Sequence, residues 1–260
     1  MNLLKGTAQR WVVFVVAVAL WELVTRAADD VFFPPPTTIA EAAGQVWFSP
    51  LFGEHVVPGV GRMLLGWALS GVIGVALGIL LGRSRTAMAY LGPTFTFMRS
   101  IPPPLLVPFF AATIGVTSMQ LPTIVFGAVW PVLLNTVDGA RAVDDTKVDT
   151  ARAFRLSGPQ WLLGVVLPSA LPKVFAGLRL SLSISLILMV ISELVGSING
   201  IGNQLVQAQR DYDLPTMWAW IVLLGVLGYL FNTLLLLAEL RALAWQPRHS
   251  LEAQSLATGG

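Results

Sequence analysis

Long apolar stretches, separated by short clusters of charged residues, dominate the pattern of this 260-residue chain. A helix needs about 20 mostly apolar residues to cross the hydrocarbon core of a bilayer. The apolar stretches near this length predict six membrane-spanning helices, at approximately 9–26, 61–82, 91–114, 119–137, 174–195 and 216–240. The pattern therefore predicts an all-α polytopic membrane protein whose residues 1–260 form a single transmembrane domain.

The third predicted span contains three consecutive prolines, Pro102, Pro103 and Pro104. Proline lacks a backbone N–H and clashes with the preceding helical turn, so we expect this span to be kinked or broken. Residues 115–118 are expected to separate it from the fourth span. The first stretch also resembles a signal peptide with a conceivable cleavage site at 25–27, but its bulky flank and the later spans favour an uncleaved anchor.

The composition supports a membrane protein and narrows its chemistry. Apolar residues make up 55% of the chain and charged residues only 12%, against about 25% in a typical soluble protein. The chain has no cysteine and only two histidines, His55 and His249, which leaves little material for a metal site or a cysteine nucleophile. The net charge of +2 is better explained by membrane topology than by nucleic acid, so no nucleic-acid partner is expected.

The distribution of lysine and arginine predicts the orientation, because cytoplasmic segments are enriched in these residues. With the N-terminus inside, the inner segments hold Lys5, Arg10, Arg83, Arg85, Arg141, Lys147, Arg152, Arg155, Lys173, Arg241 and Arg248. The outer segments then hold only Arg26, Arg62 and Arg210. Both termini are therefore expected to be cytoplasmic.

The connection between the fourth and fifth spans covers residues 138–172, and charge is densest in its first part, where eight of the eighteen residues 138–155 are charged. Residues 149–155 have helix-forming character, and the Ser157-Gly158-Pro159 sequence is expected to stop this helix and allow a second one to start. The second helix carries Trp161, Leu162, Val165 and Val166 on one face, and Pro168 and Pro172 are expected to end it before the fifth span. A solvated connector would explain the charges. A helix–break–helix with an apolar tip instead indicates a docking site for another protein.

This connection resembles the EAA loop of binding-protein-dependent ABC importer permeases. Asp149-Thr150-Ala151 and the later Val165-Val166-Leu167-Pro168 match that loop in spacing, although Asp149, Thr150 and Arg155 replace its usual Glu, Ala and Gly. Further fragments resemble the nitrate, sulfonate, taurine and bicarbonate branch of the family. They are Leu20-Trp21-Glu22-Leu23, Pro34-Pro35-Pro36-Thr37, Ile101-Pro102-Pro103, Asn135-Thr136-Val137-Asp138-Gly139, Leu167-Pro168, Leu171-Pro172, Gly177-Leu178-Arg179, Glu193-Leu194 and Gly200-Ile201-Gly202.

The resemblance implies a type I ABC importer permease in the plasma (inner) membrane of a prokaryote. It implies a homodimer with alternating access, two cytoplasmic ATPase subunits, and an extracellular or periplasmic binding protein that delivers a small and often anionic solute. The chain has no Gly-x-x-x-x-Gly-Lys-Ser/Thr motif, so ATP and Mg are expected in the ATPase and no cofactor or metal is expected in this chain. Carried over to matching positions, the ATPase contacts are Asp149, Thr150, Ala151, Arg152, Phe154, Leu156, Ser157 and Gly158.

Several polar residues are predicted at membrane depth. Charges there almost always face protein or a water-filled cavity, so we consider a group of candidates for the translocation pathway. They are Arg99, Pro102, Pro103, Asn135, Arg179, Ser181, Ser185 and Glu193. A structural role is the alternative for Arg179 and, more strongly, for Glu193. The two lie fourteen residues apart in one span, about 21 Å along the axis, and cannot pair with each other.

The second predicted span carries small residues in steps of four, namely Gly66, Ser70, Gly74, Gly78 and Gly82. Small residues at this spacing allow close approach of a neighbouring helix, which favours packing over a pore lining.

Two other functions are compatible with a membrane bundle. An intramembrane enzyme would need a nucleophile with a base, paired acids or a metal set, and the predicted spans do not supply one, so the chain is not expected to be an enzyme. A channel or assembly subunit without ATP coupling would share the spans but would have no need of the helix–break–helix connection.

Overall fold

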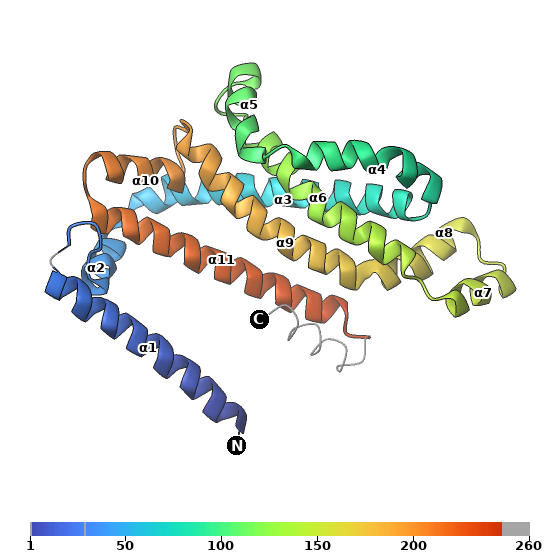
Figure 1. The fold of residues 1–260 in the computed structure, drawn as a ribbon, viewed down its shortest axis with the longest axis horizontal. Helices are drawn as coiled ribbons and strands as arrows, with labels where there is room; N and C mark the ends of the chain where they lie inside the picture. Colours follow the sequence, from blue (N-terminus) through green and yellow to red (C-terminus); the bar gives the residue numbers. More distant parts are fainter. Residues whose placement is uncertain (1, 29, 246–260) are drawn as a thin grey trace. The chain divides into compact units, whose positions relative to one another are not determined.

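The computed structural model describes residues 2–28 and 30–245, with side chains from residue 12 onward, and these residues form helices joined by short connections (Figure 1). No strand occurs within these described ranges. The helices are α1 (Asn2–Ala28), α2 (Pro36–Trp47), η1 (Phe52–Val56), α3 (Val57–Gly82), α4 (Arg85–Ser100), η2 (Pro103–Leu105), α5 (Leu106–Ile114), α6 (Gln120–Arg141), α7 (Asp145–Ala153), α8 (Gly158–Trp161), η3 (Leu162–Val166), α9 (Leu167–Leu194), α10 (Ile201–Arg210) and α11 (Leu214–Ala242). The predicted all-α class is confirmed.

Contacts within the chain divide it into two compact units. One contains the residues up to Arg62 together with Met189–Leu227, and the other contains Met63–Leu188 together with the residues from Gly228 onward. Helices α3, α9 and α11 each begin in one unit and end in the other.

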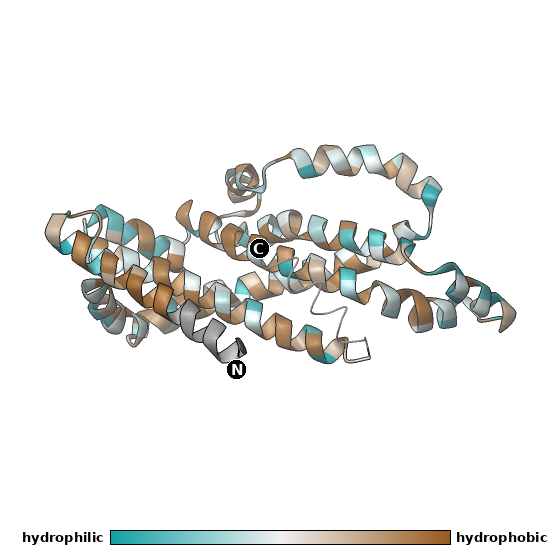
Figure 2. Cartoon of the chain, turned by 60° about the horizontal axis from the view of Figure 1, so that its bottom comes forward, coloured by the Kyte–Doolittle hydropathy of each residue, from teal (hydrophilic) through white to brown (hydrophobic). Residues whose placement is uncertain are grey.

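Four helical stretches are long and apolar enough to cross a membrane, judged on the part of the chain that the structure describes. They are Phe52–Gly82, Gln120–Arg141, Gly158–Leu194 and Leu214–Ala242, and Figure 2 shows their apolar colouring. A fifth candidate is a bent pair, Arg85–Ser100 with Pro103–Ile114, whose two parts meet at 69°. The first predicted span, 9–26, lies in α1, where the side chains before residue 12 fall outside the described set, so the number of six spans stays a prediction.

The break in the third predicted span is confirmed. Pro102 has an extended backbone (φ −64°, ψ 119°), and the short 3-10 turn η2 follows it before α5 begins. The predicted separation from the fourth span is also confirmed, because α5 ends at Ile114 and α6 begins at Gln120.

Pro168 and Pro172 do not end the helix before the fifth span, contrary to the prediction. The stretch Gly158–Leu194 is continuous and passes from α8 into α9 through the π-helical turn η3. In η3 the Leu167 N–H donates to the Leu162 carbonyl, one residue further back than in an α-helix. A π turn is wider than an α turn, which relieves the clash of the Pro168 ring with the preceding turn.

A π-helical turn also precedes α3, again next to a proline. The π turn η1 has a Val57 N–H that donates to the Phe52 carbonyl, and Pro58 follows directly. The helix of the second predicted span therefore begins earlier than expected, at Phe52 rather than near 61.

In the first unit, α2 packs on the beginning of α11 and on α1. Ile39, Ala42, Ala43 and Ala219 form a buried cluster there, against which Trp21, Trp47 and Trp218 pack. The Trp47 Nε1–H donates to the Ala219 carbonyl at 3.2 Å, and the Trp21 and Trp218 rings meet edge to face with centroids 5.6 Å apart. These contacts fix α2, an element that the sequence pattern did not predict.

In the second unit, α6 is packed tightly against α3. A Cβ added at Gly78 would lie 2.5 Å from the Thr136 Cβ, and one added at Gly74 would lie 2.7 Å from the Val132 Cβ. Gly66 and Gly82 face Ile124 and Ala140 of α6 equally closely. Backbones can approach this closely only where one helix lacks side chains, so the predicted packing role of the small residues is confirmed.

A neighbouring face of α6 packs on α9 in the same way. A Cβ at Gly177 of α9 would lie 2.8 Å from the Pro131 carbonyl oxygen, and one at Gly139 of α6 would lie 3.0 Å from the Ala170 carbonyl oxygen. Helix α6 therefore contacts both α3 and α9 closely, and glycine is required at both contacts.

Replacing Gly78 by alanine is expected to lower the thermal stability of the purified chain, because the new methyl group would overlap Thr136. Overpacking of this kind costs about 1–3 kcal/mol. Thermal unfolding in detergent, followed by size-exclusion chromatography, measures the effect.

Gly61→Ala is the matched control on the same helix, since a Cβ there meets no atom within 4 Å. Equal unfolding temperatures for the Gly78→Ala and Gly61→Ala proteins would contradict the close packing of α3 on α6.

Candidate functional site

The charged connection after α6 begins with a capped short helix, α7. The Asp144 carboxylate accepts from the Thr146 N–H at 2.7 Å, which satisfies a backbone donor at the helix N-terminus. Hydrogen bonds from the side chain and the N–H of Thr146 lower the pKa of the Asp144 carboxyl, so it stays charged where the helix dipole favours a negative group. The Thr150 hydroxyl donates to the Thr146 carbonyl at 2.7 Å inside the helix.

The end of α7 is a Schellman motif. The Leu156 N–H donates to the Ala151 carbonyl and the Arg155 N–H donates to the Arg152 carbonyl, both at 3.0 Å. This geometry places Arg155 in the left-handed region, with φ of 52°. Glycine is the residue that adopts this conformation without strain, so the glycine of the family pattern has a physical explanation at this position.

A second capped turn begins α8. The Ser157 N–H and hydroxyl both donate to the Gln160 Oε1 at 2.9 Å, and Pro159 lies in the first turn. The predicted helix–break–helix is therefore confirmed, with the break at Phe154–Ser157 and hydrogen bonds on both sides of it.

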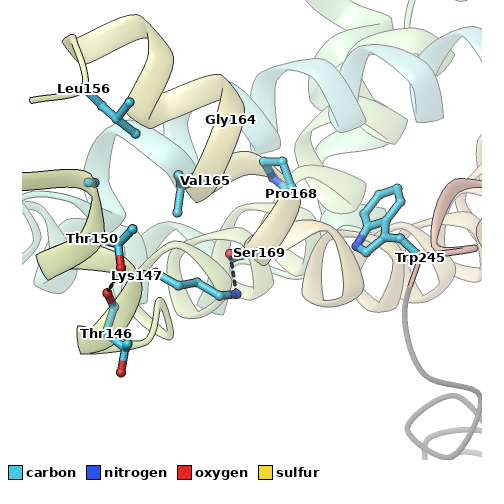
Figure 3. Close-up of a pocket in the computed structure, with 10 residues that line it drawn as sticks. Thr146, Lys147, Thr150, Leu156, Gly164, Val165, Pro168, Ser169 and Trp245 are labelled. Carbon is cyan, nitrogen blue, oxygen red and sulfur yellow. Dashed lines mark hydrogen bonds between the residues drawn. The ribbon is translucent and has the colours of Figure 1, made fainter. Parts of the chain in front are cut away.

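An open cleft of about 500 Å³ lies between α7 and the η3–α9 segment (Figure 3). Thr146, Lys147 and Thr150 of α7 lie on one side, and Val165, Pro168 and Ser169 lie on the other. The Lys147 Nζ donates to the Ser169 Oγ at 3.2 Å across the cleft. Trp245, which is 60% exposed, stands at its rim.

The predicted ATPase contacts divide into a single buried residue and an exposed set. Ala151 is only 9% exposed and lines the cleft together with Leu156. The Phe154 ring is 77% exposed, and Asp149, Thr150, Arg152, Ser157 and Gly158 are exposed as well. Arg152 and Asp149 form an ion pair at 3.4 Å that is open to solvent and contributes little to stability. The connection therefore exposes the Phe154 phenyl group on a backbone that is held by the hydrogen bonds described above.

Arg179, a candidate for the pathway, is paired inside the second unit. Its Nη2 lies 2.5 Å from the Glu239 carboxylate of α11, with both side chains mostly buried. Arg179 also lines a cavity of about 480 Å³ between α9 and α11, together with Ser183, Tyr229 and Asn232. The sequence pattern does not predict Glu239 as its partner; the available signal is an acid near the end of the last predicted span.

Glu193, the other charged candidate on this helix, is buried in the first unit. It is 1% exposed, its Oε1 lies 3.8 Å from Arg62 Nη2, and its Oε2 accepts from the Gly202 N–H at 3.0 Å. Arg179 and Glu193 therefore have different partners, as their separation along the span predicts. The sequence pattern does not predict that Arg62 pairs with Glu193. The available signal is the position of Arg62 at the edge of a predicted span.

The remaining pathway candidates lie in different local settings. Ser181 and Ser185 are fully buried, and the Ser185 hydroxyl donates to the Ser181 carbonyl at 2.8 Å. The Asn135 amide donates to the Pro131 carbonyl at 2.8 Å, within α6. Arg99 and Pro102 are exposed, whereas Pro103 is half-buried and lies close to Gly127 of α6. The pathway assignment of all these residues stays a prediction.

Residues 74–243 match the family of binding-protein-dependent transport system inner membrane components. The match covers more than half of the chain, and the chain belongs to this family. It is thus a permease subunit of an ABC transporter.

Named relatives are similar along most of their length. The chain is 31% identical over 235 residues to the putative aliphatic sulfonates transport permease protein SsuC of Bacillus subtilis, covering 89% of this chain and 85% of the relative. It is 32% identical to the bicarbonate transport system permease protein CmpB of Synechococcus elongatus over 189 residues, which is 72% of this chain and 65% of that protein. It is 26% identical to the nitrate import permease protein NrtB of Synechocystis, with 88% and 86% covered.

The fold is shared with a chain of the MetNI methionine ABC transporter, solved in inward-facing conformations. The TM-score is 0.63 at 20% identity, covering 75% of this chain and 95% of the other. The predicted type I importer fold is confirmed by this match.

Replacing Arg155 by glycine is expected to stabilise the connection by about 1 kcal/mol, because glycine adopts φ of 52° without the steric cost of a Cβ. Hydrogen–deuterium exchange of the amides in α7, Asp145–Ala153, should become slower in this variant. Arg155→Val is the opposing control, since a β-branched side chain is strained in this conformation. Faster exchange in the glycine variant than in the valine variant would contradict the Schellman geometry.

Proposed function

We propose that this permease carries a small anion and that the exposed face of α7 and the following turn seats in a cytoplasmic ATPase subunit. The observation that carries this proposal is the place of α7 between two packed helices. It follows the end of α6 and precedes the start of α9, and these helices contact each other through Gly139 and Gly177. A displacement of α7 therefore acts on both helices.

The connection is suited to transmit force. The cap at Asp144, the Schellman motif at Arg155, the capping box at Ser157 and the Lys147–Ser169 hydrogen bond hold it at four points. Phe154 protrudes from this frame with little contact of its own, which is the form expected of an anchor residue for a groove in a partner.

An anion is supported as the substrate class by the relatives, whose names specify sulfonates, bicarbonate and nitrate. Of the two candidate cations on the translocation pathway, Arg99 and Arg179, Arg179 lies at a cavity whose lining is otherwise mainly apolar. This combination favours an anion with an apolar part, such as a sulfonate.

The proposed assembly is a homodimer of this chain in the plasma membrane of a prokaryote, with two ATPase subunits that bind ATP and Mg on the cytoplasmic side. A soluble binding protein delivers the substrate on the other side. Both termini are proposed to be cytoplasmic; of the cationic residues behind this orientation, the side chains of Lys5 and Arg10, and Arg248 as a whole, lie outside the described residues.

Phe154→Ala is expected to reduce ATP-driven uptake at least about tenfold in vesicles reconstituted with the ATPase and the binding protein, since a buried phenyl anchor contributes about 2 kcal/mol or more at an interface. Membrane insertion should be unchanged, because Phe154 is exposed in the isolated chain. Uptake per assembled permease is the measured quantity.

Phe48→Ala is the matched control, since Phe48 is 89% exposed and lies outside the connection. Wild-type uptake by the Phe154→Ala protein would contradict the proposal. Uptake that proceeds without any ATPase would also contradict it and would favour a channel.

Arg179 is tested by a double substitution that separates transport from stability. Arg179→Ala alone leaves the Glu239 carboxylate buried without its partner, which costs about 3 kcal/mol or more and lowers the amount of assembled permease. Arg179→Ala with Glu239→Ala removes both charges and is expected to restore assembly while uptake of the anion stays low. Recovery of uptake together with assembly would make the ion pair purely structural.

A further inference from the structure

A buried carboxylate joins three elements of the first unit at one point. Glu193 is the penultimate residue of α9, and its Oε2 accepts from the Gly202 N–H in the first turn of α10. Its Oε1 faces Arg62 of α3, 3.8 Å away. The carboxylate therefore satisfies a donor at the N-terminus of α10, where the helix dipole favours a negative charge, and pairs with a cation of a second helix.

Three glycines make room for this carboxylate. A Cβ added at Gly59 of α3 would lie 2.5 Å from Oε1, and one added at Gly202 would lie 2.7 Å from the Glu193 Cβ. A Cβ at Gly200 would overlap the carboxyl carbon itself. Any side chain at these positions would displace the acid, so the glycines and Glu193 form one structural unit.

A polar network extends from this point through the connection between α9 and α10. The Arg62 Nη2 donates to the Asn199 side chain at 3.0 Å, and the Asn203 amide donates to the Ser197 carbonyl at 2.7 Å. His55 Nδ1 accepts from the Gly200 N–H at 3.3 Å, and its Nε2 lies 3.0 Å from the Gln204 amide. The bonds hold α10 to the end of α9 and to the η1–α3 segment.

The backbone turns sharply on both sides of α10. Gly196 and Gly200 have φ of 135° and 130°, and Tyr212, just after α10, has φ of 56°. Helix α10 is therefore a separate rigid piece between two turns, held in place by the contacts at Glu193. Its exposed residues Gln207, Gln209 and Arg210 are too polar to face hydrocarbon.

We infer that Glu193 is a positioning residue that clamps α10 to the ends of α3 and α9, and through which substrate delivery at that end acts on α9. The inference rests on the proposed function. In chain order α9 begins next to the coupling connection and ends at Leu194, one residue after Glu193, and its 28 residues extend about 42 Å, enough to cross the bilayer. Glu193 therefore lies near the end of α9 that is farther from α7 along the chain, and the proposed orientation puts this end on the side where a soluble binding protein delivers its ligand.

The clamp itself is tested on the purified permease by hydrogen–deuterium exchange. Glu193→Gln keeps the size of the side chain but removes the charge that pairs with Arg62, and charged hydrogen bonds are worth more than neutral ones. We expect exchange of the first amides of α10 to become about tenfold faster. Glu41→Gln, a substitution of an exposed acid on α2, is the control and should leave α10 unchanged.

The role in transport is tested in vesicles with the ATPase and increasing amounts of liganded binding protein. In Glu193→Gln we expect the half-saturating concentration for stimulated uptake to rise about fivefold or more, because a loosened α10 must be ordered at each encounter. The maximal rate per assembled permease should fall less. Gly202→Ala should act in the same direction, whereas Gly44→Ala, where a Cβ meets no atom within 4 Å, should not.

Unchanged exchange in α10 of the Glu193→Gln protein would overturn the clamp. A reduced amount of assembled permease with an unchanged half-saturating concentration would overturn the role in delivery and leave only a structural acid. If Glu193→Gln does not assemble, Asn199→Ala is used instead, with the same two criteria. This substitution removes the second partner of Arg62 and leaves Glu193 in place. Absence of stimulation in the wild-type protein would count against the proposed function, while the exchange measurement would still decide on the clamp.

Discussion

The close packing of α6 against α3 and α9 is the constraint on which the second unit of this permease depends. Glycines at 74, 78 and 82 of α3 and at 177 of α9 bring the backbones of these helices into contact with α6, where a single methyl group would overlap. In a bilayer, helices gain little from burying apolar surface against one another, so such contacts carry much of the association. Because α7 connects α6 to α9, this packing also determines what a force on α7 can move.

Buried charge follows a second rule in both units. Two largely buried acids near the ends of long helices each pair with an arginine: Glu239 of α11 pairs with Arg179, and Glu193 of α9 pairs with Arg62. An unpaired ion in hydrocarbon or in a helix interface is costly, so each acid and its arginine offset the cost of burying the other. The two pairs differ in setting, since Arg179 borders a cavity whereas Glu193 is enclosed by glycines and by the start of α10.

The sequence predicted those features that depend on local patterns. Hydropathy located the long helices, the three prolines located the break before η2, and the glycine repeat located the packing face of α3. The turns around Ser157 located the two halves of the connection. Proline rules failed at Pro168, because a π turn, which no local pattern signals, carries the helix past it. The partners Glu239 and Arg62, and the placing of α10, could not be predicted because they depend on contacts between residues far apart in the sequence.

The absence of native cysteine allows a direct test of the central claim, which is that α7 lies in the cytoplasm and seats in the ATPase. Single cysteines would replace Phe154, after α7, and Gln207, in α10. Each would be labelled in oriented membranes with a thiol reagent that does not cross the bilayer. The account predicts that the cysteine at 154 reacts only from the cytoplasmic side and is protected when the ATPase is bound, whereas the cysteine at 207 reacts only from outside. Labelling of position 154 from outside, or equal labelling with and without the ATPase, would contradict it.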